Sequence, residues 1–277
     1  MIKLLVDSSS DYTSKELDER GLTMVPLQIT IGDKHYYDGI DLKKDEFYEI
    51  LVKSKEFPKT SQPSPNAFLS IFEEAKDKGD EVICILLSSA LSGTFQSARL
   101  AKEMCEYDGI YLVDSLSATI GIRVLVEEAI RMRDSGKSAD EIVKKIEDIK
   151  SRITIIAGVD TLEYLCKGGR VSKTVATIGG LANIKPVITV SKEGKVDVIA
   201  KKRGTAKTIE YIKEKIAEYE IDEDYDIYTV YTKGEENTLK LEEKLEDIKI
   251  DDRIQIGPTI GAHVGLGAYG IVFIEKR

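Results

Sequence analysis

Hydrophobic and polar positions in the first half of the chain follow a pattern of short strands separated by helices. Apolar runs bounded by polar residues predict buried strands at residues 2–6, 24–31, 82–87 and 110–114. Pro26 lies within the second run and cannot donate a hydrogen bond to a neighbouring strand, so that run is expected near a sheet edge or at a strand start. Strands that alternate with helices are typical of a parallel sheet with crossover helices.

Helix start and stop signals lie between these strands. Thr13 and Glu16 have the spacing of a capping box and Gly21 provides a stop, which together predict a helix over residues 14–20. Comparable signals predict a helix that starts at Ser64 and Pro65 and is ended by Gly79, a helix after residue 94, and two helices over residues 122–150, the second capped by Ser138 and Glu141.

The pattern changes near residue 150. Two β-type runs, residues 186–190 and 195–202, flank the turn SKEG and predict a β-hairpin. A helical apolar stripe follows over residues 209–216, and the last thirty residues are expected to form a strand, a glycine-rich loop and another strand.

A chain of 277 residues exceeds the usual size of one domain, so we expect two domains in an α/β protein. Residues 1–150 are predicted to form an N-terminal Rossmann-like α/β domain with a parallel sheet. Residues 151–277 are predicted to form a C-terminal α+β domain with a mixed or antiparallel sheet.

Composition excludes several classes of function. Hydrophobic residues make up 42% and charged residues 32% of the chain, which is typical of a globular protein. The net charge is -9 and basic residues are interleaved with acids, so no nucleic-acid partner is expected. No apolar run approaches the roughly 18 residues of a spanning helix, and Asp7 interrupts the start before a signal-peptide core. We expect a cytoplasmic protein without a transmembrane segment, and transient contact with a membrane surface is left open.

Cysteine and histidine usage predicts neither a metal nor a cofactor. Cys84, Cys105 and Cys166 lie far apart in apolar stretches, where a thiol behaves as a small hydrophobic group, so inert core cysteines are expected. The two histidines, His35 and His263, do not belong to a zinc-binding pattern such as HExxH.

Two loops carry hydroxyl groups next to helix starts: KTSQPS at residues 59–64 and SSALSGT at residues 88–94. In an open parallel sheet such loops lie at the carboxyl ends of the strands, where free N–H groups and the helix dipole favour an anion. The chain has no Walker sequence and no GxGxxG that opens a helix after a strand, so a carboxylate suits the loops better than a phosphate. The alternative is that these serines and threonines are only helix caps.

The stretch GPTIGAHVGLGAYG at residues 257–270 surrounds His263 with five glycines, which allow close backbone approach. Two interpretations stay open: a ligand-binding histidine, or a structural histidine in a loop.

Seven segments of the chain resemble the DegV family of bacterial fatty-acid-binding proteins. They occur in order and cover the chain nearly end to end, and their combination is far more specific than any one of them. The segments are DSSSD (7–11), YYDGIDL (36–42), TSQPSP (60–65), SSALSGTFQSA (88–98), LEYLCKGGRVSK (162–173), IKPVITVSKEGKV (184–196) and GPTIGAHVGLG (257–267).

This resemblance implies two α/β domains that enclose one long-chain fatty acid of the C16–C18 type, such as palmitate, stearate or oleate. Its carboxylate would lie at the domain junction, held by the hydroxyls of Thr60 and Ser92, by the loop residues Ser61 and Gly93, and by His263. A separate fatty acid kinase subunit would phosphorylate the bound carboxylate, so this chain would be a carrier and not an enzyme.

Two further assignments stay paired with simpler alternatives. Ile178 and Leu181 lie in an apolar helical pattern at residues 174–182, which would form a wall for the acyl tail or an ordinary core helix. Arg170 and Arg203 lie in turns, where they would contact the kinase subunit or a nucleotide phosphate, or remain solvated surface residues.

Two other functions compete with the carrier. In a hydrolase, Ser92 would be the nucleophile and His263 its base, but the chain lacks the GxSxG of a nucleophile elbow. The chain could instead be a lipid-sensing regulatory module. No physical role for Asp38 in the YYDGIDL segment follows from the pattern.

Overall fold

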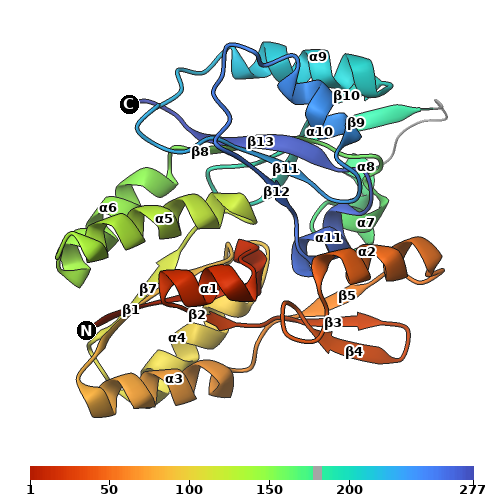
Figure 1. Cartoon of the computed structure of the whole chain (residues 1–277). Helices are drawn as coiled ribbons and strands as arrows, with labels where there is room; N and C mark the ends of the chain where they lie inside the picture. The colour runs from red at the N-terminus through yellow and green to blue at the C-terminus, as the bar shows by residue number, and fades with distance from the viewer. Residues whose placement is uncertain (177–182) are drawn as a thin grey trace.

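The computed structural model describes residues 1–176 and 183–277, and the strands of this described part form three sheets (Figure 1). The first sheet has the order β2-β1-β6-β7, with bounds Leu22–Val25, Ile2–Asp7, Glu81–Leu86 and Ile110–Asp114. The second has the order β10-β9-β8-β13-β11-β12, with bounds Val196–Arg203, Ile184–Val190, Ile153–Gly158, Tyr269–Ile274, Tyr228–Tyr231 and Asp252–Gln255. The third has the order β4-β3-β5, with bounds Lys34–Tyr37, Gln28–Ile31 and Lys59–Ser61.

The first sheet is parallel throughout and is buried on both faces. Alternate residues of β1 and β6 point to opposite faces, which is why these strands are apolar at nearly every position. Helices α3 (Pro65–Lys78) and α4 (Thr94–Cys105) cover one face. Helices α5 (Ile120–Asp134) and α6 (Ala139–Lys150) cover the other, and α1 (Ser14–Arg20) packs beside β2.

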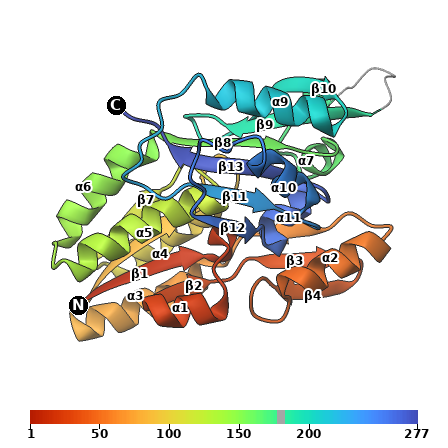
Figure 2. The same cartoon turned by 45° about the horizontal axis from the view of Figure 1, so that its top comes forward.

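The second sheet is mixed, since β11 and β12 are parallel while its other neighbouring strands are antiparallel. Helices α9 (Thr205–Ile216) and α10 (Glu236–Glu242) cover its outer face. Its inner face packs toward α5 and the first sheet, as Figure 2 shows. Leu4, Ile85, Ile155 and Val272 belong to one continuous hydrophobic cluster, so a single core joins the two sheets.

The predicted fold class is confirmed: a parallel N-terminal sheet is followed by a mixed C-terminal sheet. The capping boxes of α1 and α6 and the β9–β10 hairpin also form as expected. Ser64 is the N-cap residue of α3, but its side chain makes no capping hydrogen bond. The chain passes from the first sheet to the second between β7 and β8, and the domain boundary at residue 150 stays a prediction.

The predicted single strand at residues 24–31 is wrong. The run breaks at Pro26: β2 ends at Val25 in the first sheet, and β3 begins at Gln28 in the small third sheet. Proline has no N–H to continue the parallel ladder, so the chain leaves the first sheet there. Leu27, between the two strands, is fully buried.

The predicted glycine-rich loop near the C-terminus is also wrong, because residues Pro258–Val264 form helix α11. Pro258 occupies the first helical position, where its fixed φ suits a helix and its missing N–H costs nothing. Gly261 allows close packing, since a Cβ there would lie 2.6 Å from the hydroxyl oxygen of Tyr48. His263 therefore lies on a packed helix.

Several short elements had no signal strong enough for prediction: the third sheet, α2 (Lys44–Lys53), the 3-10 helix η1 (Ser8–Ser10) and α7 (Glu163–Lys167). Helix α8 (Lys173–Ala176) covers the described start of the helical pattern predicted at residues 174–182. Cys84 and Cys105 are buried as expected, but Cys166 is only half-buried, so its assignment to the core is wrong.

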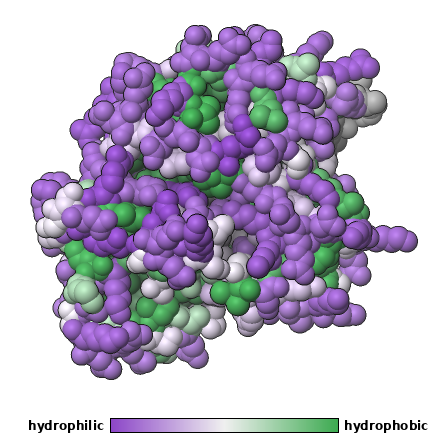
Figure 3. Space-filling model, in the orientation of Figure 1, coloured by the Kyte–Doolittle hydropathy of each residue, from purple (hydrophilic) through white to green (hydrophobic). Residues whose placement is uncertain are grey.

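Figure 3 shows hydrophilic side chains over most of one face, with several separate hydrophobic patches. None of the helices in the described ranges is long and apolar enough to cross a membrane.

Candidate functional site

A cavity lies between the carboxyl ends of the first sheet's strands and the inner face of the second sheet. Leu27, Leu87 and Ala118 line it from segments that follow β2, β6 and β7, and Ile155 and Ile188 line it from β8 and β9. About 840 Å³ of space, its opening included, is free of protein atoms. Open α/β sheets bind ligands at this edge.

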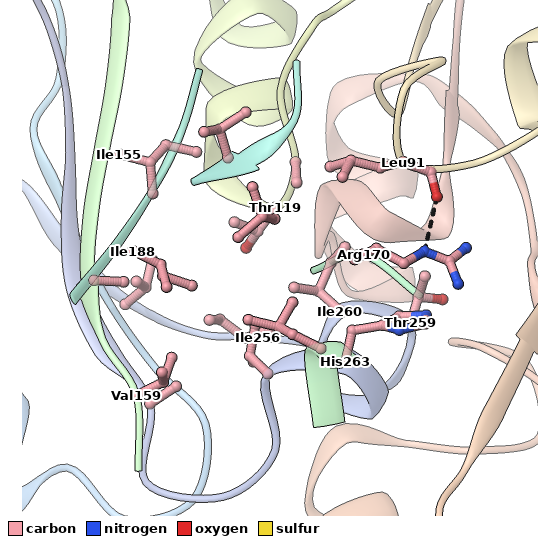
Figure 4. Close-up of a pocket in the computed structure, with 18 of the residues that line it drawn as sticks. Leu91, Thr119, Ile155, Val159, Arg170, Ile188, Ile256, Thr259, Ile260 and His263 are labelled. Carbon is pink, nitrogen blue, oxygen red and sulfur yellow. Dashed lines mark hydrogen bonds between the residues drawn. The ribbon is translucent and has the colours of Figure 1, made fainter. Parts of the chain in front are cut away.

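The lining is mostly aliphatic, and its charged and imidazole groups lie on one side of the cavity. Figure 4 shows Arg170 and His263 on one side of the cavity and Ile155, Val159 and Ile188 on the opposite side. A molecule with one polar end and a long apolar body matches this division. The polar lining residues are Thr60, Ser92, Thr119, Arg170, Thr189, Thr259, His263 and Tyr269.

His263 and Thr60 form the central polar contact of the cavity. His263 extends from α11, and its Nε2 lies 2.8 Å from Oγ1 of Thr60, the middle residue of β5. Gly168 lies directly against the ring, because a Cβ at that position would collide with Nδ1 of His263. The tertiary structure therefore brings together two predicted residues that are 203 positions apart.

The imidazole of His263 is neutral at pH 7. Burial lowers its pKa to about 4, and the positive charge of Arg170 acts in the same direction. Nδ1 is buried and has no hydrogen-bond partner among the described residues, whereas Nε2 is bonded to Thr60.

Ser92 and Gly93 belong to the second hydroxyl loop, and Gly93 packs against the first. Ser92 lines the cavity, and its Oγ lies 2.9 Å from Oγ1 of Thr94 and accepts the N–H of Thr94 at 3.3 Å. Gly93 is the N-cap of α4 and does not itself line the cavity. A Cβ there would collide with the side chain of Gln62, so glycine permits the two loops to pack together.

Arg170 lines the cavity next to His263. Its Nε donates to the carbonyl of Leu91 at 3.0 Å (Figure 4), and its Nη1 donates to the carbonyl of Gly168. Burial lowers the pKa of Arg170, but an arginine stays charged in proteins. A half-buried positive charge therefore lies at the polar side of the cavity.

Other predicted residues lie elsewhere. Ser61 is exposed and does not line the cavity, because successive residues of a strand point to opposite sides. Arg203 is exposed at the end of β10. Ile178 and Leu181 lie outside the described residues, so their assignment to the acyl tail stays a prediction.

Several lining residues were missed by the sequence interpretation. Thr259 belongs to the glycine-rich segment, whose periodicity around Ile260 and Val264 was a usable helix signal. Thr119 precedes α5 with φ 50° and ψ -130°, a conformation that no sequence pattern announces. The aliphatic residues of β8 and β9 have the pattern of ordinary core strands, which does not indicate that they line a cavity.

In the hydrolase alternative, His263 would be hydrogen-bonded to Ser92, and the structure shows other partners for both residues. Nε2 of His263 contacts Thr60, and the hydroxyl of Ser92 contacts Thr94 instead. Within the described ranges, no group of three or more histidine, cysteine, aspartate or glutamate residues is arranged to hold a metal ion.

Comparison with known proteins identifies the family. The model of a family described as "Uncharacterised protein, DegV family" matches residues 1–276. A DegV domain-containing protein of Caldanaerobacter subterraneus subsp. tengcongensis is 39% identical over 279 residues, which cover 99% of both chains. Another, from Clostridium acetobutylicum, is 33% identical over 278 residues and also covers 99% of both chains.

Solved structures agree with this assignment. A DegV family protein from Thermus thermophilus, described with fatty acid binding, matches with a TM-score of 0.88, 28% identity and 99% coverage of both chains. A stearic-acid-binding protein from Eubacterium ventriosum matches with a TM-score of 0.87 and 28% identity, covering 100% of this chain and 99% of that one. Because the family model and the full-length relatives span nearly the whole sequence, this chain belongs to the DegV family.

Proposed function

We propose that the chain binds one long-chain fatty acid in the cavity, with its carboxylate at Thr60 and Ser92 and its tail among the aliphatic residues of the second sheet. The observation that carries this proposal is an apolar cavity with a hydroxyl group bonded to a neutral, buried histidine. The descriptions of the Thermus thermophilus and Eubacterium ventriosum proteins support the same ligand class.

The histidine orients the threonine for an anion. A buried N–H without a partner is rarer in proteins than a buried acceptor without one, so we infer that Nε2 of His263 carries the proton. Nε2–H then donates to Oγ1 of Thr60, and Nδ1 is the acceptor left without a partner. This leaves the hydroxyl proton of Thr60 free to donate to a carboxylate.

The remaining donors and charge suit the same end of the ligand. The hydroxyl of Ser92 lies at the start of α4, where the helix dipole favours an anion, and Arg170 adds a positive charge. Tail burial supplies most of the affinity: about fourteen methylenes at about 0.8 kcal/mol each give about 11 kcal/mol, and association costs several kcal/mol. The polar end therefore sets orientation more than affinity.

A titration of Thr60→Ala with palmitate tests the position of the carboxylate. The substitution removes one charge-assisted hydrogen bond, so binding is expected to weaken by about 1.5–3 kcal/mol, or about 10–150-fold. Ser61→Ala is the matched control, because the neighbouring hydroxyl is exposed and lies outside the cavity lining. Isothermal titration gives the affinities, and melting curves check that both variants are folded.

Two results would contradict the proposal at different levels. If Thr60→Ala binds palmitate as tightly as the unchanged protein, the carboxylate lies elsewhere. If the unchanged protein, stripped of lipid, binds neither palmitate nor stearate, the chain is not a fatty-acid carrier.

We propose further that a separate kinase subunit phosphorylates the bound carboxylate. Arg170 supports this, because it lines the cavity and also borders a surface groove formed with Lys195 and Asp197. An incoming phosphate would meet a positive charge beside the ligand's carboxylate. Arg203, exposed at the end of β10, is the second candidate for contact with the kinase.

Replacement of Arg203 separates partner contact from lipid binding. With the cognate kinase and ATP, Arg203→Ala is expected to slow acyl phosphate formation by about tenfold, because a charged contact across the interface is lost. Its affinity for palmitate should not change, since Arg203 does not line the cavity. Arg99→Ala, at an exposed position of α4, is the control. Equal rates for the two variants would exclude Arg203 from the interface.

A further inference from the structure

Two buried carboxylates next to the cavity have no part in the proposed contact with the ligand. Asp11 and Asp38 are 1% and 3% exposed. They belong to the DSSSD and YYDGIDL segments, which marked the family resemblance without showing a role. Burying a carboxylate costs free energy unless hydrogen bonds compensate, so their partners indicate what they do.

Asp38 holds the first turn of α11 from the other half of the chain. Its Oδ2 accepts the backbone N–H of Thr259 at 3.1 Å and the hydroxyl of Thr259 at 2.5 Å. Thr259 is the second residue of α11, and N–H groups in the first turn of a helix have no partner within the helix. Asp38 therefore caps the helix that carries His263, across 221 positions of sequence.

Asp11 holds the residue directly before α11 and the residue directly before α5. Its Oδ1 accepts the N–H of Gly257 at 2.8 Å, directly before α11. Its Oδ2 accepts the hydroxyl of Thr119 at 2.5 Å, directly before α5. Thr119 has φ 50°, which is costly for a β-branched residue, and its bond to Asp11 helps to hold that conformation.

The same network reaches a third lining residue, Leu27. Ser8 Oγ lies 3.4 Å from Oγ1 of Thr259 and accepts the N–H of Leu27 at 3.1 Å. The N–H of Asp38 donates to the carbonyl of Leu27 at 3.0 Å. Leu27, Thr119 and Thr259, which come from three separate parts of the chain, are thus all fixed to the same two segments.

We propose that Asp11 and Asp38 are positioning residues for the cavity: they fix the start of α11 and the hydroxyl of Thr119, and so set the position of His263 relative to Thr60. The consequence for fatty-acid affinity rests on the proposed function. The consequence for the structure of α11 does not.

The charges around Asp38 give the arrangement a pH dependence. Asp11 faces it from the loop after η1, Lys44 and Tyr48 lie on α2, and Arg123 of α5 acts on Asp11. Asp11 and Asp38 also line a surface pocket, and the other charged residues of that pocket are Lys15, Lys43, Lys44, Asp45 and Glu46. Burial raises the pKa of Asp38 to about 7, and the negative charge of Asp11 adds to the effect while the bonds from Thr259 oppose it.

The sign of the pH effect follows from the raised pKa. The folded state favours protonated Asp38 relative to the unfolded chain, where the ordinary pKa is 3.8. The stabilising contribution is full below about pH 4 and is lost as the pH rises to about 7. Asp38→Asn keeps an acceptor for Thr259 and cannot ionise, so its melting temperature should fall less between pH 5 and pH 8 than that of the unchanged protein.

The test compares Asp38→Ala, Asp38→Asn and Asp41→Asn, the last an exposed aspartate of the same segment. Asp38→Ala leaves the buried N–H of Thr259 without a partner and its hydroxyl with only the longer contact to Ser8, so we expect faster hydrogen exchange at the amide of Thr259 and a palmitate Kd raised about tenfold. Asp38→Asn should recover most of the exchange protection and affinity. Asp41→Asn should match the unchanged protein in exchange, affinity and pH profile.

Each outcome decides the proposal. Unchanged exchange and unchanged Kd in Asp38→Ala would overturn it, and so would an Asn variant as impaired as the Ala variant. If no variant binds palmitate, the proposed function fails, and the amide exchange alone still decides the positioning role. If Asp38→Ala does not fold, the exchange at the amide of Thr259 in Asp38→Asn decides, and loss of protection there despite the retained acceptor would overturn the proposal.

Discussion

Octanoate is expected to bind about ten-thousand-fold more weakly than palmitate. The two acids share a carboxylate and differ by eight methylenes, and each buried methylene contributes about 0.8 kcal/mol, which gives about 6 kcal/mol in total. The lining formed by Ile155, Val159 and Ile188 supports this expectation, because it provides an aliphatic surface on the side of the cavity opposite Arg170 and His263.

A series of saturated acids from C8 to C18 measures this dependence. Competition against a fluorescent fatty acid gives the affinities, and titration at several temperatures should show a negative heat-capacity change that grows with chain length. The slope should flatten where the tail exceeds the cavity. If affinity did not change between C8 and C16, the tail would lie outside the cavity and the proposed orientation would be wrong.

Phe68→Ala is expected to lower the free energy of unfolding by about 3–5 kcal/mol while it leaves the affinity for palmitate unchanged. Phe68 is fully buried on α3, with its ring centre 6.2 Å from that of Phe72. Its cluster covers the face of the first sheet that is turned away from α5 and the second sheet. Truncation leaves a cavity there without touching the lining of the ligand site.

Denaturant unfolding gives the free energy, and palmitate titration at 20 °C or below gives the affinity of the folded variant. Leu100→Ala, at a 46% exposed position of the neighbouring helix α4, is the control and should change stability by no more than about 0.5 kcal/mol. A loss of palmitate affinity in folded Phe68→Ala would show that the outer core and the cavity are coupled.

Local sequence signals determined most of the regular structure. The capping boxes at Thr13 and Ser138 and the apolar runs of β1, β6 and β7 predicted their elements, because the interactions that specify them lie within a few residues. Pro26 shows what local signals could not determine. The residue marked an irregularity, but whether the chain stayed in the sheet or crossed to another one depended on distant partners.

Part of the cavity lining could be predicted from the sequence, and the carboxylate site that these residues would form stays a prediction. Hydroxyls near two helix starts indicated an anion, and Thr60, Ser92 and His263 do meet at one cavity. Ser61 was included because it shares the loop, and only the direction of β5 separates its side chain from that of Thr60. The sequence did not show why residues 93 and 168 are glycines. In the structure, the side chains of Gln62 and His263 pack against them and leave no room for a Cβ.

The sequence by itself determined a parallel sheet, a second sheet that is mixed or antiparallel, and the residue types that could hold an anion, because each of these follows from patterns within a short stretch of chain. Only the tertiary structure decided that Asp38 caps α11 and that Asp11 bonds to Thr119. A buried carboxylate is stable only with partners, and these partners lie 221 and 108 positions away. Contacts over such separations exist only once the two sheets have packed together.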